Sequence, residues 1–383
     1  MHSLNQFIDE KLAKLEAASL RRRLIDTARE DGLWVTRGGR RLLSFCCNDY
    51  LNLSHHPAVK AAAIKAIEQY GVGSGASRLV TGNNPLFREL ETKLARFKGA
   101  EAAIVFGSGY LANTGIIPAL IGSDDLILMD ELNHACLWAG ARLSNATVLT
   151  YPHNDAEVAG KLLQEHRASH IHAMIATDGV FSMDGDIAPL RALSEISKEH
   201  DAWLMVDDAH GLGVIGNGRG AAHNGEPLDI PLQMGTLSKA VGGYGAYLCA
   251  SQSVVDWLHN RARSFVYSPG LPPASIAAAI AALDVIEHDK ALIEKPLAKA
   301  RAFTKAAGLP EPASNILPVT LGDETRTLRA SEMLADEGFL VVGIRPPTVP
   351  KGTARLRLTF TAGQPDDEVE RLAHLVRTRI LGN

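Results

Sequence analysis

Residues 172–210 read HAMIATDGVFSMDGDIAPLRALSEISKEHDAWLMVDDAH, and this stretch decides the fold class. Residues 172–177 and 202–206 are apolar runs of strand length, and Pro189 begins a segment between them that has the spacing of a helix. A strand, a helix and a strand in this order form a βαβ unit, in which the strands are parallel and the crossover is right-handed. The stretch therefore predicts an α/β protein with a mostly parallel sheet.

Polar residues follow the second strand of this unit. Ligands of open α/β sheets bind at the carboxyl ends of strands, so chemistry is expected at Asp207 and His210. A carboxylate buried at a strand end needs a cationic partner, and a protonated pyridine nitrogen would serve. The next residues, 211–216, match the G-x-G-x-x-G dinucleotide pattern. Residues 217–220 (NGRG) cannot begin the helix that this motif requires, so we reject a dinucleotide site.

A single lysine, Lys239, stands among small and hydroxylated residues in 235–245, GTLSKAVGGYG. A lysine that forms a Schiff base must approach an aldehyde closely and lose its proton when desolvated, and a hydroxyl neighbour can hold a phosphate. We therefore predict that Lys239 carries pyridoxal phosphate. Taken alone, the stretch fits an exposed loop lysine between glycines equally well, and the rest of the chain decides between the two.

A second small-residue turn predicts a phosphate site. Ser108, Gly109 and Tyr110 lie between an apolar run at 102–106 and an apolar helix at 111–120. Turn amides and a helix N-terminus favour a phosphate group, so this turn forms one half of a predicted phosphate cup. Thr236 and Ser238 could supply the other half.

The composition excludes several classes of protein. The 383-residue chain has a formal net charge of −4 and one short basic cluster, at 21–23, so no nucleic-acid partner is expected. None of the four cysteines lies in a C-x-x-C pair. We therefore expect no metal site, and reduced thiols in a cytoplasmic protein. Residues 274–286 form the most apolar later stretch and are too few to cross a bilayer, so no membrane partner is expected.

Three regions are predicted along the chain. Residues 1–45 hold an N-terminal helix over 4–29 and a short strand, residues 46–289 form a large α/β domain that binds the cofactor, and residues 290–383 form a small α+β domain. The arginines at 21–23 end the first helix, where a solvated face with a favourable helix dipole would explain them. In the last region, prolines stiffen 343–350, GIRPPTVP, and Arg345 is a candidate for gripping a carboxylate; the alternative is a surface salt bridge.

With Asp207, His210 and Lys239 in this order, the chain resembles the fold-type I pyridoxal phosphate enzymes and, within them, the α-oxoamine synthases. The likeness runs from end to end. It implies a large domain with a mostly parallel seven-stranded sheet flanked by helices, a small α+β C-terminal domain and a homodimer. The segments that carry it are 48–51 (NDYL), 73–78 (GSGASR), 180–186 (VFSMDGD), 207–216, 235–239, 344–350 and 353–357 (TARLR).

The resemblance implies a role for each matching residue. Lys239 would be the Schiff-base lysine and the acid and base at the α-carbon, Asp207 would pair with the pyridine nitrogen, and His134 would stack on the ring and border the substrate. The ring's phenolic oxygen would be contacted by two residues, His210 and Ser182. The phosphate would be held by Ser108, Gly109, Tyr110 and Thr236. The amino-acid carboxylate would bind Arg345, and the acyl substrate would contact Arg21 and Thr348.

The implied reaction is a decarboxylative condensation of L-alanine with a pimeloyl thioester, either of CoA or of a carrier protein. Three alternatives stay open: a sister synthase that uses glycine or serine with another acyl-CoA, a plain aminotransferase, and a catalytically silent protein that binds pyridoxal phosphate. Two departures from the family's pattern bear on the site. Asp178 stands where the family usually has a glutamate, one methylene longer, and Tyr110 occupies a position often filled by phenylalanine.

Overall fold

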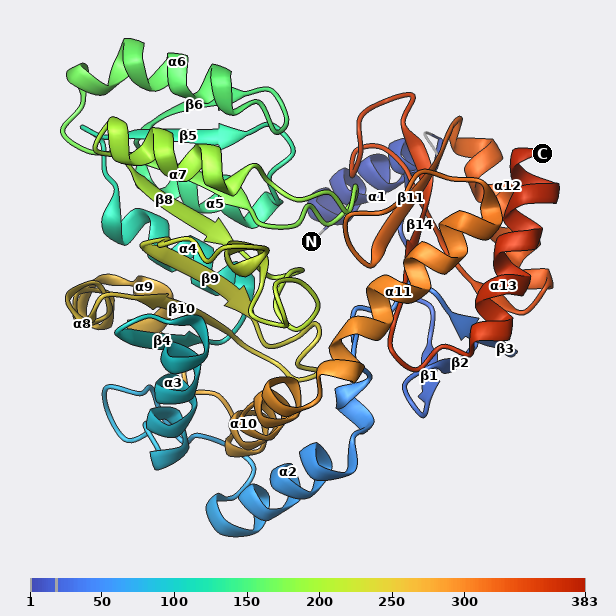
Figure 1. Cartoon of the computed structure of the whole chain (residues 1–383), viewed down its shortest axis with the longest axis horizontal. Helices are drawn as coiled ribbons and strands as arrows, with labels where there is room; N and C mark the ends of the chain where they lie inside the picture. The colour runs from blue at the N-terminus through green and yellow to red at the C-terminus, as the bar shows by residue number, and fades with distance from the viewer. Residues whose placement is uncertain (1, 18–19, 383) are drawn as a thin grey trace.

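The computed structural model describes residues 2–17 and 20–382. A seven-stranded sheet forms the centre of the larger part of the chain (Figure 1), in the order β4-β10-β9-β8-β7-β5-β6. Strands β5 to β9 pair in parallel, whereas β10 runs antiparallel to both of its neighbours. The predicted sheet is confirmed, with strands β4 (Ala102–Phe106), β5 (Leu126–Asp130), β6 (Thr147–Tyr151), β7 (Ala173–Asp178), β8 (Trp203–Asp207), β9 (Leu232–Thr236) and β10 (Ala246–Ala250).

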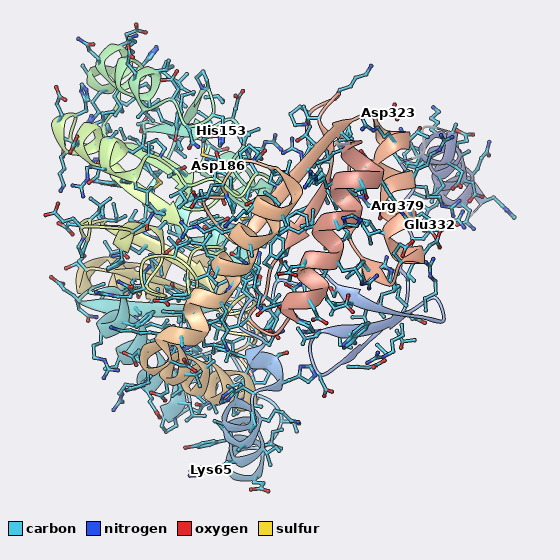
Figure 2. The ribbon with its side chains drawn as sticks, turned by 45° about the vertical axis from the view of Figure 1, so that its right-hand side comes forward. Lys65, His153, Asp186, Asp323, Glu332 and Arg379 are labelled. Atoms are coloured by element: carbon cyan, nitrogen blue, oxygen red, sulfur yellow. The ribbon has the colours of Figure 1, made fainter. Side chains whose placement is uncertain are left out.

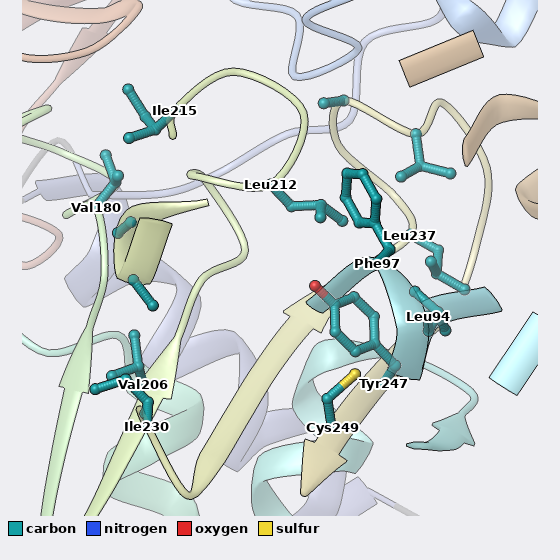
Figure 3. Packing of buried hydrophobic residues seen from close by; sticks show 14 of the residues in the cluster. Leu94, Phe97, Val180, Val206, Leu212, Ile215, Ile230, Leu237, Tyr247 and Cys249 are labelled. Atoms are coloured by element: carbon teal, nitrogen blue, oxygen red, sulfur yellow. The ribbon is translucent and has the colours of Figure 1, made fainter. Parts of the chain in front are cut away.

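Helices cover both faces of this sheet because its strands bury both sets of alternating side chains. In β10, Ala246 and Leu248 join the core of one face, while Tyr247 and Cys249 join the core of the other, where Figure 3 shows them. The first face packs under α4 (Gly109–Leu120), α5 (Ala135–Ser144), α8 (Gln252–Arg261) and α9 (Arg263–Val266). The second packs under α3 (Pro85–Lys98), α6 (Ala156–His166), α7 (Leu190–Glu199) and α10 (Pro273–His288), with α2 (Pro57–Tyr70) against α10.

The smaller part is built on two further sheets (Figure 1). One, in the order β1-β2-β3-β12, contains β1 (Thr27–Glu30), β2 (Trp34–Arg37), β3 (Arg40–Ser44) and β12 (Phe339–Leu340). The other, β11-β14-β13, contains β11 (Ile316–Gly322), β13 (Val342–Ile344) and β14 (Ala354–Thr359). Their core also buries α11 (Lys290–Ala307), α12 (Glu324–Asp336), α13 (Asp366–Leu375) and a π-helical turn at Val376–Leu381.

Local sequence signals explain several element ends. Asn84 caps α3 by accepting a hydrogen bond from the amide of Leu86, Pro85 occupies the first turn, and Gly99 ends the helix in the left-handed conformation that a glycine adopts without strain. The helix predicted at 85–97 and its stop at Gly99 are thus confirmed.

The predicted N-terminal helix is wrong in its length. Helix α1 spans His2–Ala17 and buries no residue, and β1 pairs antiparallel with β2 across a turn that contains Gly32. The predicted residues 18–19 lie outside the described part of the chain. Residues 20–26 have no regular structure and 27–30 form β1, so Arg21 does not stand at a helix end. Several elements were not predicted at all, among them α5, β9, β2 and α9.

Within residues 2–17 and 20–382, no helix combines the length and the apolar character needed to cross a membrane.

Candidate active site

The carboxyl ends of neighbouring parallel strands bring the candidate residues to one edge of the large sheet. Strands β7, β8 and β9 end at Asp178, Asp207 and Thr236, and Asp178 pairs directly with Asp207 in the register. Lys239 follows in the tight connection between β9 and β10, where Gly242 donates to its carbonyl at 2.8 Å. Gly242 has a positive φ of 73° and lies against the backbone of Ser54, so a side chain there would collide with it.

Lys239 lies at one end of a line of three polar groups. Its Nζ is 3.0 Å from Nε2 of His210, and Nδ1 of His210 is 2.5 Å from the hydroxyl of Tyr50. His210 and Tyr50 are buried, and Lys239 is half-buried. Burial lowers the pKa of Lys239, and burial together with the charges of Lys239 and Arg357 holds the pKa of His210 well below its usual value. The amine and the imidazole are therefore both biased towards their neutral forms.

Asp207 is buried at the end of β8 and makes no ion pair within the described residues. Its Oδ2 accepts a hydrogen bond of 2.7 Å from Nδ2 of Asn113 on α4, and its Oδ1 accepts one of 3.1 Å from the amide of Ala209. A buried carboxylate without a cation is costly, so the position suits a group that brings a positive charge.

Asp178 ties the His134 turn to the sheet. Its Oδ2 accepts a hydrogen bond of 2.7 Å from the backbone amide of His134, and its own amide donates to the side chain of Asn133 at 3.1 Å. Burial and the nearby charge of Asp207 raise the pKa of Asp178 well above its usual value. The aspartate side chain therefore binds the backbone amide of His134. His134 in turn is the N-cap of helix α5, which was not predicted.

The predicted phosphate cup lies where β9 meets the start of α4. Ser108 caps this helix by accepting from the amide of Leu111 at 3.3 Å, and Tyr110 is exposed. A Cβ on Gly109 would stand 2.8 Å from the methyl group of Thr236, so only glycine allows this approach. The hydroxyl of Thr236 is buried and has no hydrogen-bond partner among residues 2–17 and 20–382, so it is free to bind a ligand oxygen.

Ser182 and two arginines of β14 join the large and small sheets. The carbonyl of Ser182 accepts a hydrogen bond of 2.5 Å from Nε of Arg357, and Asp184 pairs with Arg355. Ser314 donates to the carbonyl of Gly185 at 2.6 Å. The 180–187 loop is thereby held against the small domain next to His210.

The side chains of the predicted substrate residues Arg345, Arg21 and Thr348 do not bond to one another in the part of the chain that the structure describes. Arg345 is half-buried, and its side chain has no hydrogen bond or ion pair within the described residues. Arg21 pairs with Glu16 at 3.3 Å, whereas Thr348 accepts a hydrogen bond of 3.3 Å from Arg22. The basic triplet does reach the 343–350 loop, but through Arg22 rather than Arg21.

The glycines at 211–220 have a structural explanation. The loop wraps around the buried carboxylate of Asp208, which binds the amide of Ala221 and forms an ion pair of 3.0 Å with Lys98. Side chains at Gly211 or Gly220 would collide with that carboxylate. Residues 211–220 form turns and no helix begins among them, so the part of the dinucleotide motif that requires a helix is missing here.

Three residues of the site had no predicted role, namely Tyr50, Asn113 and Arg357. Tyr50 and Arg357 lie within segments that resemble the family. Asn113 is a fully buried polar residue in a mostly apolar helix, which was a usable signal. The residues present fit pyridoxal phosphate, because they offer a neutral-biased amine, an unpaired buried carboxylate and an unpartnered hydroxyl beside a helix N-terminus.

Comparisons with known proteins agree with this geometry. Residues 40–376 match the family described as aminotransferase class I and II. The chain is 61% identical over 377 residues to the 8-amino-7-oxononanoate synthase of Beijerinckia indica subsp. indica, which covers 98% of both chains.

Solved structures share the fold. A serine palmitoyltransferase structure with pyridoxal phosphate has a TM-score of 0.91 and 28% identity, covering 99% of this chain and 98% of the other. The 8-amino-7-oxononanoate synthase of Francisella tularensis has a TM-score of 0.75 and 27% identity, covering 89% and 98%. The chain therefore belongs to the aminotransferase class I and II family of fold-type I pyridoxal phosphate enzymes and, within it, to the α-oxoamine synthases.

Proposed function

We propose that this protein condenses L-alanine with a pimeloyl thioester, releasing CO2 and the free thiol and forming 8-amino-7-oxononanoate. The observation that carries the proposal is the amine of Lys239, 3.0 Å from His210 and on the same sheet edge as the buried Asp207. The 61% identity to a relative of that name favours this member of the family over a sister synthase.

Pyridoxal phosphate, when bound, supplies an electron sink that stabilises negative charge at the α-carbon of an amino acid. Lys239 would hold its aldehyde, and Asp207 would keep the pyridine nitrogen protonated. His134 would stack on the ring, and His210 and Ser182 would contact the phenolic oxygen. The phosphate would be held by Ser108, Gly109, Tyr110 and Thr236.

Lys239 would move the α-proton. A neutral amine is needed to take that proton, and the lowered pKa of Lys239 supports such a role. His210 lies within hydrogen-bond distance of the same nitrogen and would orient it.

Two basic regions would recognise the carboxylates of the substrates. Arg345 would bind the alanine carboxylate, since its guanidinium makes no other ion pair within the described residues. Arg21 and Thr348 would contact the acyl chain. The hydrogen bond from Arg22 to Thr348 supports a basic end to the acyl site, because a pimeloyl chain ends in a carboxylate.

A homodimer would complete the enzyme, with the 73–78 loop as the segment that crosses to the partner. The family resemblance supports this arrangement.

Release of free thiol from pimeloyl-CoA tests the function. The purified protein is incubated with pimeloyl-, acetyl- or palmitoyl-CoA and with L-alanine, glycine or L-serine, beside Lys239→Ala as the control. We expect thiol release with alanine and pimeloyl-CoA only, and none from the variant.

Other outcomes of this assay separate the alternatives. Release only with another pair would move the protein to a sister synthase, and amino transfer to a keto acid without a thioester would indicate an aminotransferase. If pimeloyl-CoA is inert, the same panel is repeated with a pimeloyl carrier protein. No turnover with either donor would contradict the proposal and favour a silent binder.

A further inference from the structure

Tyr50 lies in the NDYL segment at 48–51, to which the proposed function gives no role. It is fully buried, and its hydroxyl lies 2.5 Å from Nδ1 of His210, whose other ring nitrogen faces Lys239 at 3.0 Å. The contact joins elements 160 residues apart in the chain. The hydroxyl has two other polar neighbours. Oδ1 of Asn48 is 3.4 Å away, beyond the usual range of an O–H···O bond, and the guanidinium of Arg357 can only donate to the phenol oxygen, so the phenol proton belongs to the contact with His210.

The backbone around Tyr50 is fixed from both sides. Its amide donates to the carbonyl of Asn48 at 2.9 Å, and its carbonyl accepts a hydrogen bond of 2.7 Å from the amide of Ala362 in the small domain. The preceding residue, Asp49, accepts a hydrogen bond from the hydroxyl of Ser54 and forms an ion pair of 3.2 Å with Arg29. The hydroxyl is thus presented to His210 by a rigid turn, as positioning requires.

The protonation states of Tyr50 and His210 decide which ring nitrogen of His210 carries its single proton. Burial raises the pKa of Tyr50 to about 12, so the phenol keeps its proton, and the lowered pKa of His210 keeps the ring neutral. A neutral imidazole has one N–H and one acceptor nitrogen. The positive charge of Arg357 acts on the phenol and makes its hydroxyl a better donor, so Nδ1 accepts and Nε2 carries the proton.

We propose that Tyr50 is a positioning residue: its hydroxyl donates to Nδ1 of His210 and keeps the imidazole proton on Nε2, facing the amine of Lys239. The inference rests on the proposed role of Lys239 in holding the cofactor. An N–H that points at an amine favours the neutral amine, which is the reactive form.

The variant Tyr50→Phe removes only the hydroxyl. Nδ1 then loses its donor, the proton can move to Nδ1, and Nε2 becomes an acceptor that favours the charged ammonium of Lys239. The pKa of Lys239 should rise by roughly one unit. Five other groups act electrostatically on His210 and Lys239 and stay in place. They are Arg357 on β14, His134 before α5, Cys136 on α5, Asp178 at the end of β7 and Asp207 at the end of β8.

Competitive acetylation measures that pKa directly in the full-length, cofactor-free chain. Acetic anhydride is applied from about pH 6 to 11, and acetylation of Lys239 is compared by peptide mass spectrometry with that of Lys65, an exposed reference on α2 (Figure 2). Tyr247→Phe is the matched control, because it removes a buried tyrosine hydroxyl that has no hydrogen-bond partner in the described residues.

We expect the midpoint for Lys239 to rise in Tyr50→Phe and to stay unchanged in Tyr247→Phe. An unchanged midpoint in Tyr50→Phe would overturn the inference. Borohydride reduction of the wild-type holoenzyme, followed by peptide mapping, tests the proposed function separately, since it shows whether pyridoxal phosphate is held on Lys239.

A second measurement needs no Tyr50 variant. Two-bond 1H–15N spectra of the histidine-labelled wild-type chain, with His210 assigned by His210→Asn, report which ring nitrogen carries the proton. A proton on Nε2 supports the inference, and a proton on Nδ1 contradicts it.

Discussion

Replacing Lys98 with methionine should loosen the loop that carries His210. The side chain of Lys98 is fully buried, its Nζ lies 3.0 Å from Oδ2 of Asp208, and it also donates to the carbonyl of Arg219. Methionine fills a similar volume and leaves the Asp208 carboxylate buried without a cation. Breaking a buried ion pair in this way costs about 3–5 kcal/mol.

The rate of hydrogen exchange at the amide of Ala221 measures this loss of local stability, because that amide donates to both oxygens of Asp208. A loss of about 3–5 kcal/mol corresponds to exchange faster by roughly a hundredfold to a few thousandfold. Lys161→Met is the matched control. Its ion pair with Glu157 is exposed, so exchange at Ala221 should not change.

The effect should also depend on pH. Burial raises the pKa of Asp208 above its unfolded value, and loss of Lys98 raises it further. A carboxyl with a raised folded pKa loses stability as pH rises through that pKa, so the damage should be smaller near about pH 5 than near about pH 8. Exchange within threefold of wild type at about pH 8 would refute the reasoning.

Three further predictions concern the site and its supports. Although burial opposes it, hydrogen bonds to Asp130 and Asp186 raise the pKa of His153 to about 10, so the melting-temperature loss in His153→Gln should be largest near about pH 6, decline as the pH rises and disappear above about pH 10 (Figure 2); a loss that is constant with pH would contradict this. Asp207→Asn should slow exchange of the alanine α-proton with D2O, followed by NMR, by at least about a hundredfold; an unchanged rate would exclude its electrostatic role. Arg345→Lys should raise KM for alanine by about tenfold or more with a smaller effect on kcat, because lysine cannot make a bidentate contact with the alanine carboxylate. An unchanged KM would count against this role of Arg345.

The sheet was predictable because its strands carry local signals. β7 and β8 are unbroken apolar runs, and the carboxyl-end rule placed Asp207 correctly from sequence. β9 escaped prediction because Gln233 and Gly235 interrupt its apolar run, although both are buried. The helix over 4–29 was predicted too long because the apolar spacing that supports it stops at Leu15, and residues 27–30 pair with β2 instead.

The contacts within the site were less predictable. The hydrogen bonds of Tyr50 to His210 and of Asn113 to Asp207 join residues far apart in the chain, and no local pattern encodes such a distance. Asp178 shows the same limit, since its change from the family's usual glutamate was visible but its contact with the backbone of His134 was not.

The carbon balance of the reaction tests the central claim most directly. The protein is given L-alanine labelled in its carboxyl carbon together with the pimeloyl thioester that releases thiol, and the products are analysed by mass spectrometry. The account predicts 8-amino-7-oxononanoate without the label, labelled CO2 in equal amount, and neither product from Lys239→Ala. A product that keeps the labelled carboxyl carbon, or equal turnover by the variant, would contradict it.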